Sequence, residues 1–275
     1  MVVKNVEITI LIEDSNRSGE PHLKAKIIDN EVIIMMDAGP NPEDLLHNFD
    51  TMGINLQNVN VIALSNVHYD HTGGLIEVLK QTKKRVQFIA HPTIFEPKLK
   101  IMPQLRLIGP PFKSSVVESA GGVPLLATDP VKMVDGITTT GEVPRRTAFE
   151  SVRGFWTVQD RSFVEDRMID DQSLVIDVEN KGLIVVAGCA HSGIINTIKH
   201  AQKITANNRV HAVLGGFHLI SADARSIQAT VNELEKLDPH FIGPCHCTGK
   251  KATKKIAETF GDRCCPLHTG DIIEF

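Results

Sequence analysis

The chain of 275 residues is 42% hydrophobic and 23% charged, the composition of a globular protein with ample apolar material for a core. Its net charge of −4, from 29 Lys and Arg against 33 Asp and Glu, gives no overall positive field for nucleic acid or anionic membrane. No apolar signal region and no apolar stretch long enough to span a bilayer is found. We therefore expect a cytoplasmic protein with no nucleic-acid or membrane partner; a homo-oligomer is compatible with the sequence.

The first third of the chain shows strand and helix patterns in alternation. Strands are predicted over 6–12, 23–28, 32–36, 59–64 and 86–90, and helices that begin at Pro42 and Leu75. The strands at 23–28 and 32–36 are expected to form a hairpin around Asp29-Asn30. Pro42 suits the first helical turn, because the backbone N–H that it lacks would have no partner there. His22 is expected at the surface or at the edge of a cleft.

One short stretch, from Leu64 to Gly74, concentrates residues suited to metal binding between a strand and a helix. His68 and Asp70 alternate, so an extended backbone directs both side chains the same way. His71 then turns to the other side. A solvated loop does not need imidazoles at this spacing, whereas a metal site does.

From 92 to about 168 the periodic pattern breaks down. Prolines interrupt this region at 92, 97, 103, 110, 111, 124, 130 and 144. We expect an irregular, lid-like segment, because long irregular stretches in compact domains are usually functional or disordered. The alternative is an ordinary extension of the sheets, including a strand over 136–143. Arg145 and Arg146 could meet an anionic substrate or have ordinary packing roles.

Regular patterns return in the last hundred residues. Strands are predicted over 173–178, 183–187, 210–214 and 272–275, and helices over 194–201, 227–234 and 252–260, with Ser192 and Thr248 as caps. Glycine-rich turns that follow apolar strands carry His191, His218 and His246, and sites of layered α/β proteins lie at such strand ends. Strands followed by helices in two successive halves predict an α/β fold, a four-layer αββα sandwich formed by one domain over 1–275.

The five cysteines are an odd number concentrated towards the C-terminus, which argues against a disulfide framework. Cys245 and Cys247 alternate along a strand and cannot close a tetrahedral zinc site by themselves. Cys264 and Cys265 are expected to be buried thiols. Cys189 is either a metal ligand or a small buried residue.

The stretch from 66 to 74 resembles the His-x-His-x-Asp-His signature, with trailing Gly-Gly, of the metallo-β-lactamase superfamily; Asn66 stands in place of the first histidine. Gly-Cys-x-His-x-Gly-Ile from 188, Gly-Gly-Phe-His from 215 and Pro-x-His-Cys-Thr-Gly from 244 resemble one branch of it. That branch contains archaeal-type 7,8-dihydropterin-6-methyl-4-(β-ribofuranosyl)aminobenzene 5′-phosphate synthases and many uncharacterised metal-dependent hydrolases. The resemblance covers nearly the whole chain.

The resemblance implies one or two divalent metal ions, zinc foremost, with manganese or iron as alternatives. One site would consist of Asn66, His68 and His191, and the other of Asp70, His71 and His246. Because an amide oxygen is a weaker and harder ligand than imidazole, the first site should bind more weakly or prefer a harder ion. Asp70 would also act as the catalytic base. His218 would be a ligand, a donor behind a ligand or a substrate-binding group, and Asp37 would orient a ligand histidine.

These features together predict a metal-dependent hydrolase. A bound divalent ion lowers the pKa of water from about 15.7 towards 7 and polarises the electrophile. The resembling branch implies a small, phosphate-bearing substrate similar to a pterin precursor. The alternatives are an iron-dependent oxidoreductase that uses the same pocket, and a catalytically weak descendant that binds a ligand.

Overall fold

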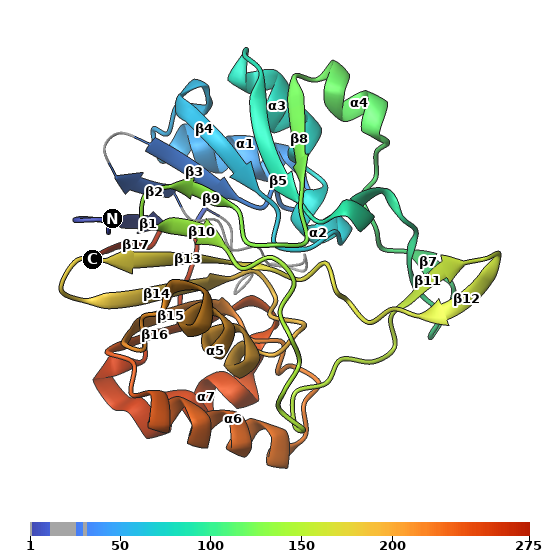
Figure 1. Cartoon of the computed structure of the whole chain (residues 1–275). Coiled ribbons are helices and arrows are strands. Elements are labelled where there is room, and N and C mark those ends of the chain that lie inside the picture. The colour runs from blue at the N-terminus through green and yellow to red at the C-terminus, as the bar shows by residue number, and fades with distance from the viewer. Residues whose placement is uncertain (1, 12–25, 30–31) are drawn as a thin grey trace.

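Two large sheets form the body of the protein (Figure 1), in a computed structural model that describes residues 2–11, 26–29 and 32–275. His22 and the start of the strand predicted over 23–28 lie outside these residues. The first sheet has the order β2 (Lys26–Asp29), β3 (Val32–Met36), β4 (Val59–Ala63), β5 (Val86–Ala90) and β8 (Gly122–Leu126). The second has the order β16 (Phe241–Cys245), β15 (Val210–Gly216), β14 (Gly182–Ala187), β13 (Ser173–Val178), β10 (Ile137–Thr139) and β9 (Lys132–Val134).

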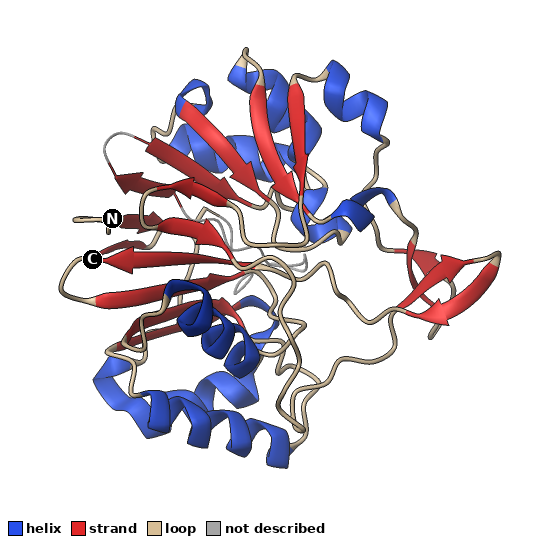
Figure 2. Ribbon diagram, viewed as in Figure 1, coloured by secondary structure: helices blue, strands red, loops and turns tan. Residues whose placement is uncertain are grey.

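Helices cover the outer face of each sheet (Figure 2). The first sheet carries α1 (Pro42–Thr51), α3 (Leu75–Thr82) and α4 (Ser114–Ser119), and the second carries α5 (Ile194–Thr205), α6 (Ala224–Leu237) and α7 (Lys250–Phe260). Between the sheets, Met36 packs in one apolar cluster with Ile176 and Leu214. Separate apolar clusters join each group of helices to its sheet. The predicted four-layer αββα sandwich is confirmed.

The direction of the strands brings several chain segments to one edge of the sandwich. β3, β4, β5 and β8 run parallel to one another, as do β14, β15 and β16. The predicted hairpin forms as the antiparallel pair β2–β3. The two ends of the chain meet where β1 (Glu7–Thr9) pairs antiparallel with β17 (Ile272–Glu274). Short helical turns complete the structure: α2 (Tyr69–Thr72), η1 (Leu56–Asn58), η2 (Pro92–Phe95), η3 (His246–Thr248) and η4 (Gly261–Arg263).

Of the two interpretations of the 92–168 region, the structure shows the extension of the sheets in place of a wholly irregular segment. β8, β9 and β10 extend the two large sheets, and a third sheet has the order β12 (Ser162–Glu165), β11 (Trp156–Gln159), β6 (Lys98–Lys100) and β7 (Arg106–Leu107). This small sheet lies to one side of the sandwich, at the right of Figure 1. The prolines obscured the pattern because these strands are short and most prolines lie between them. Pro124 lies within β8, an edge strand, where a missing N–H is tolerated.

Two predicted helix caps and two predicted buried thiols are also wrong. Gly193 and Gly249, both with positive φ, occupy the N-cap positions of α5 and α7 in place of Ser192 and Thr248. The carboxylate of Glu150 accepts the N–H groups of Ile195 (2.7 Å) and Asn196 (3.0 Å) at the start of α5. A distant side chain thus replaces the local hydroxyl cap. Of the thiols, Cys264 is half-buried and Cys265 exposed, because they follow the last helix at the surface.

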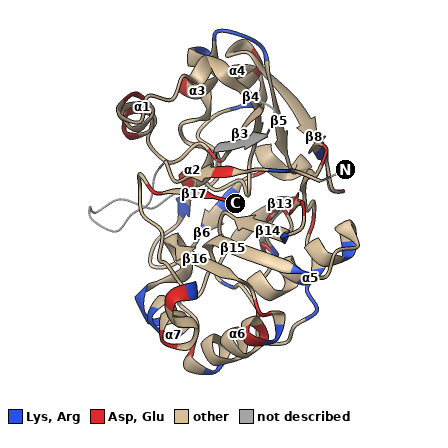
Figure 3. Ribbon diagram, turned by 90° about the vertical axis from the view of Figure 1, so that its left-hand side faces the viewer, with Lys and Arg blue, Asp and Glu red and all other residues tan. Residues whose placement is uncertain are grey.

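Charged residues of both signs lie on the outer helices, whereas the strands between them are largely uncharged (Figure 3). This distribution agrees with an apolar interior between the layers. Within the described ranges, every helix is too short or too polar to cross a membrane.

Candidate metal centre

The candidate site lies where the loops after β4, β14, β15 and β16 meet, at the carboxyl ends of parallel strands. Three non-glycine residues in these loops have left-handed backbones: Ala190 (φ 52°), His218 (φ 48°) and His246 (φ 51°). Such conformations cost about 1–3 kcal/mol each and persist where the surrounding structure imposes them. The loops are therefore held in shapes that aim particular side chains into the site.

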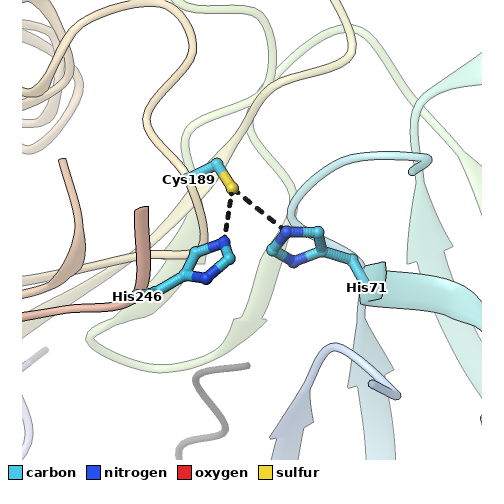
Figure 4. A group of neighbouring side chains, drawn as sticks. All are labelled: His71, Cys189 and His246. Carbon is cyan, nitrogen blue, oxygen red and sulfur yellow. Dashed lines mark hydrogen bonds between the residues drawn. The ribbon is translucent and has the colours of Figure 1, made fainter. Parts of the chain in front are cut away.

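The centre of the site is a cluster of three donors, the His71–Cys189–His246 cluster (Figure 4). Sγ of Cys189 lies 3.1 Å from Nε2 of His71 and 2.9 Å from Nε2 of His246. His71 and Cys189 are buried. Two imidazole nitrogens and one sulfur converging in this way suit a zinc or iron ion better than magnesium or calcium. The donor set thus fits a transition-metal ion.

His71 is oriented from behind by Asp37. Oδ2 of Asp37 lies 2.7 Å from Nδ1 of His71, and the same carboxylate accepts the backbone N–H (2.6 Å) and the hydroxyl (2.7 Å) of Ser65. Burial disfavours the charged imidazole, but Asp37 and Asp70 outweigh it and raise the pKa of His71 to about 9. The hydrogen bond to Asp37 fixes Nδ1, so Nε2 faces the thiol of Cys189, as in carboxylate–histidine–metal arrangements.

Asp37→Asn is expected to lower zinc affinity by about 10- to 100-fold, because the amide cannot replace the charge behind the ligand histidine. The measurement is competition for zinc against a chromophoric chelator. Asp50→Asn, at an exposed position of α1, is the matched control and should bind as the wild type does. Unchanged affinity in a folded Asp37→Asn variant would contradict the orienting role.

A glycine makes room for this arrangement. A Cβ on Gly188 would overlap the hydroxyl of Ser65 and lie 2.9 Å from Oδ2 of Asp37. The glycine of the Gly-Cys-x-His stretch thus lets the loop that carries Cys189 approach the Asp37–Ser65 pair. The sequence pattern marks this position, and the structure supplies its steric reason.

Asp70 and Asn66 have different surroundings. Oδ2 of Asp70 lies 3.6 Å from Nε2 of His71, beside the His71–Cys189–His246 cluster. Oδ1 of buried Asn66 accepts the backbone N–H of His68 at 3.0 Å, and its amide nitrogen donates to Ser65 Oγ at 3.2 Å. Both polar atoms of Asn66 are thus engaged within the motif loop. Its predicted role as a metal ligand stays a prediction.

His68, His191 and His218 form a second group of imidazoles around Phe155. The His68 ring stacks on Phe155 with centroids 5.0 Å apart, and the His191 centroid lies 5.0 Å from that of His68 and 4.5 Å from that of His218. Burial lowers the pKa of both His68 and His191 well below the ordinary value, so both are neutral. Among the described residues, Nε2 of His68 has no hydrogen-bond partner, so a buried donor atom is available for a ligand.

Sequence reasoning missed the residues that hold the motif loop in place. Asp170 accepts the backbone N–H of Val67 at 3.0 Å and pairs with the buried Lys98 ammonium at 2.8 Å. Lys98 also pairs with Asp166 at 2.7 Å. Asp170 and Val67 lie 103 positions apart. The one available signal was the Asp-Asp-Gln run before an apolar strand, which is unusual at the entrance to a buried sheet.

The loop that carries His191 is braced in the same manner. Asp171 accepts the backbone N–H groups of His191 and Ser192, both at 2.9 Å. Arg145, half-buried, donates to the carbonyl oxygens of Met168 and His191 at 3.3 Å. Of the two predicted roles of Arg145, the structure shows the packing one.

A cavity of about 280 Å³ opens beside the imidazole group. Its wall includes His191 and His218, the aromatic rings of Phe149 and Phe217, and Ser221. This volume is close to the lower end of the range for small-molecule pockets, and aromatic walls with a few polar groups are typical of them.

Comparison with known proteins extends these observations to the whole chain. No protein-family model matches it. The 7,8-dihydropterin-6-methyl-4-(β-D-ribofuranosyl)-aminobenzene-5′-phosphate synthase of Methanocaldococcus jannaschii is 36% identical over 288 residues, which cover 99% of this chain and 98% of the relative. The solved structure of Tm1679, a metal-dependent hydrolase of the β-lactamase superfamily, matches with a TM-score of 0.83 at 22% identity, over 98% of this chain and 99% of that one. Zinc-bound PqqB from Methylobacterium extorquens matches with a TM-score of 0.57 at 12% identity, over 97% of this chain and 99% of that one.

Proposed function

Since the chain belongs to the metallo-β-lactamase superfamily, in the branch of the dihydropterin-ribofuranosylaminobenzene phosphate synthase, we propose that it is a metal-dependent hydrolase acting on a small, phosphate-bearing, pterin-precursor-like substrate. The observation that carries the proposal is the convergence of His71, Cys189 and His246 on one point. The proposed substrate class rests on the similarity to the Methanocaldococcus jannaschii relative, which is a synthase of a dihydropterin-containing phosphate compound.

The proposed centre is the His71–Cys189–His246 cluster together with the carboxylate of Asp70. A divalent ion bound there would lower the pKa of water and polarise the electrophile. Asp37 holds the ligand face of His71 towards Cys189. Asp70 has a side chain that is 14% exposed, so it can both touch the centre and take a proton from an attacking water.

The substrate would enter the cavity beside His191 and His218. Phe149 offers an apolar face for a planar ring such as a pterin, and His191 and His218 line the same cavity. Phe155 stacks on His68 and closes one side of the imidazole group. Phe149, Glu150 and Ser151 line the cavity itself, so part of the 92–168 region contributes to the pocket.

A second candidate is a synthase reaction, favoured by the full-length identity of 36% to a synthase. In that case an aromatic amine in place of water would attack the pterin component, and the same cluster would stabilise the departing phosphate group. Both reactions need the metal centre, but they break different bonds. In hydrolysis water attacks phosphorus and the P–O bond breaks, whereas in the synthase reaction the amine attacks the methylene carbon of the pterin, a C–N bond forms and the C–O bond breaks as phosphate leaves.

The test uses a phosphate ester of 6-hydroxymethyl-7,8-dihydropterin, with and without 4-aminobenzoate as a model arylamine. We expect phosphate release that is lost on chelation and restored by zinc. Mass spectrometry separates the alcohol formed by hydrolysis from the amine adduct formed by a synthase. Metal-independent release, or no turnover with either nucleophile at full zinc loading, would contradict the proposal.

A further inference from the structure

A second set of metal donors lies beside the proposed centre. The donor atoms of Cys189, His218 and Cys247 all lie within 4.8 Å of one another. We propose that these three residues bind a second metal ion and that Cys189 is a ligand shared by both ions. The inference rests on the proposed function, because it places the second ion in the same pocket.

Asn66 stands where the family signature has a histidine, so the first site implied by the sequence has one imidazole fewer. The Oδ1 atom of Asn66 accepts the His68 N–H, and its amide nitrogen donates to Ser65, so the side chain is fixed within its own loop. Without Asn66, only His68 and His191 remain of the first site implied by the sequence. Two protein ligands are fewer than the three that catalytic zinc sites have.

The loops after β14, β15 and β16 each supply one member of this second set of donors. Cys189 follows β14, His218 follows β15, and Cys247 lies in η3 after β16. Because these strands are parallel neighbours in one sheet, their ends bring the three side chains together. No single strand carries the site, so the spacing between cysteines within the chain does not reveal it.

The backbone around His218 is built to hold its imidazole in this position. His218 has φ 48°, a conformation that a bulky residue adopts only where the fold imposes it. Within the described chain, Nδ1 of His218 is buried without a hydrogen-bond partner. An imidazole kept in a strained conformation beside two thiols is better explained by a ligand than by packing alone.

The absence of a side chain at Gly216 leaves room for the thiol of Cys247 in the site. A Cβ at this position would lie 2.7 Å from Sγ of Cys247 and 2.9 Å from the ring of His246. Cys247 Sγ also lies 3.5 Å from the carbonyl oxygen of Cys189, so the thiol points back towards the loop after β14. The Gly-Gly-Phe-His stretch therefore provides both a ligand and the space for its neighbour.

The donor chemistry predicts the kind of ion. Two sulfurs and one imidazole select zinc or ferrous iron and disfavour manganese and magnesium, which prefer oxygen ligands. The second ion should therefore be as soft as the first, contrary to the harder ion expected from an amide oxygen at Asn66. Sharing Cys189 couples the two sites, since its thiolate serves both ions.

The test titrates metal-free protein with Co²⁺ under anaerobic, reducing conditions. It records the equivalents bound and the thiolate-to-cobalt charge-transfer absorption. The wild type should bind two equivalents, and Cys247→Ser and His218→Ala should each bind one. In the wild type Cys189 would bond to both ions and Cys247 to the second, which gives three sulfur–metal bonds. Cys247→Ser would keep only the bond from Cys189 to the first ion, so the charge-transfer band should fall by more than half. Cys265→Ser, which removes an exposed thiol, is the matched control and should keep both ions.

His71→Ala separates this proposal from the proposed centre. If both hold, this variant also loses one equivalent and keeps the absorption due to Cys247. A wild type that binds a single ion, lost in His71→Ala but kept in Cys247→Ser, would overturn the second site and leave the first. A single ion lost only in Cys247→Ser and His218→Ala would support the second site and overturn the first. Two equivalents retained in folded Cys247→Ser would also overturn the proposal.

Discussion

His71→Ala is expected to remove the metal ion of the proposed centre and to lower the metal-dependent rate on the order of 10³-fold, because Lewis-acid assistance contributes several kcal/mol to transition-state stabilisation. His71 is buried, its Nε2 lies 3.1 Å from Sγ of Cys189, and Asp37 fixes its other nitrogen. Among the residues that the structure describes, His71 is the imidazole that joins the Asp37 carboxylate to the thiol of Cys189. The rate is measured as phosphate release at saturating zinc, and metal content by elemental analysis of the same sample.

The matched control is His47→Ala, which removes an exposed histidine from α1. It should retain the metal content and the rate of the wild type. Circular dichroism and thermal melting establish that each variant is folded. A folded His71→Ala variant with wild-type metal content and rate would exclude the cluster as the catalytic centre.

Lys98→Ala is expected to destabilise the protein by about 3–5 kcal/mol, because it leaves buried carboxylates without their partner. Burial disfavours the ammonium, but Asp170 and Asp166 raise the pKa of Lys98 above its ordinary value, so the group stays charged. Asp170 also accepts the backbone N–H of Val67 next to the metal-binding motif. The loss should therefore loosen the motif loop as well as lower the free energy of unfolding, which urea denaturation measures.

Lys80→Ala provides the comparison for Lys98→Ala. Lys80 pairs with Glu77 at 3.3 Å, but its side chain is 58% exposed, so water screens the pair and its loss should cost less than about 1 kcal/mol. Equal effects of the two substitutions would show that burial of Lys98 between two carboxylates has no special role in stability.

The layers of the fold could be predicted because their signals are local. The strand predicted over 86–90 is found as β5 (Val86–Ala90), an apolar, β-branched run with clear boundaries. The helix predicted from Pro42 is found as α1, with Asn41 capping it through the N–H of Glu43. Such elements depend on residues that are neighbours in the chain, and their order in two halves then indicates two packed sheets.

The contacts that shape the site could not be predicted, because they join residues far apart in the chain. Glu150 caps α5 from 45 positions away. Asp170 contacts Val67 from 103 positions away. Contacts between residues so far apart leave no periodic pattern in the sequence. The spacing of Cys245 and Cys247 predicts that both lie on one strand, but β16 ends at Cys245 and Cys247 lies in η3, where its close neighbour is Cys189, which follows β14.

The departure at Asn66 shows that a motif can indicate a site without showing how one of its members is engaged. The side-chain amide of Asn66 carries an oxygen atom, which predicts an oxygen ligand for a metal ion. Its hydrogen bonds to His68 and Ser65 show a side chain that shapes the loop. A sequence pattern records which residue stands at a position but not the direction in which its polar atoms point.

X-ray absorption spectroscopy of protein purified without added metal tests the metal centre most directly, since the absorption edge identifies the element and the fine structure its ligands. We predict a zinc edge with a sulfur shell at about 2.3 Å beside nitrogen at about 2.0–2.1 Å. An iron edge with the same mixed shell would keep the site and favour the oxidoreductase alternative. A shell of oxygen and nitrogen alone, or the absence of any metal edge after zinc loading, would contradict a centre built on Cys189.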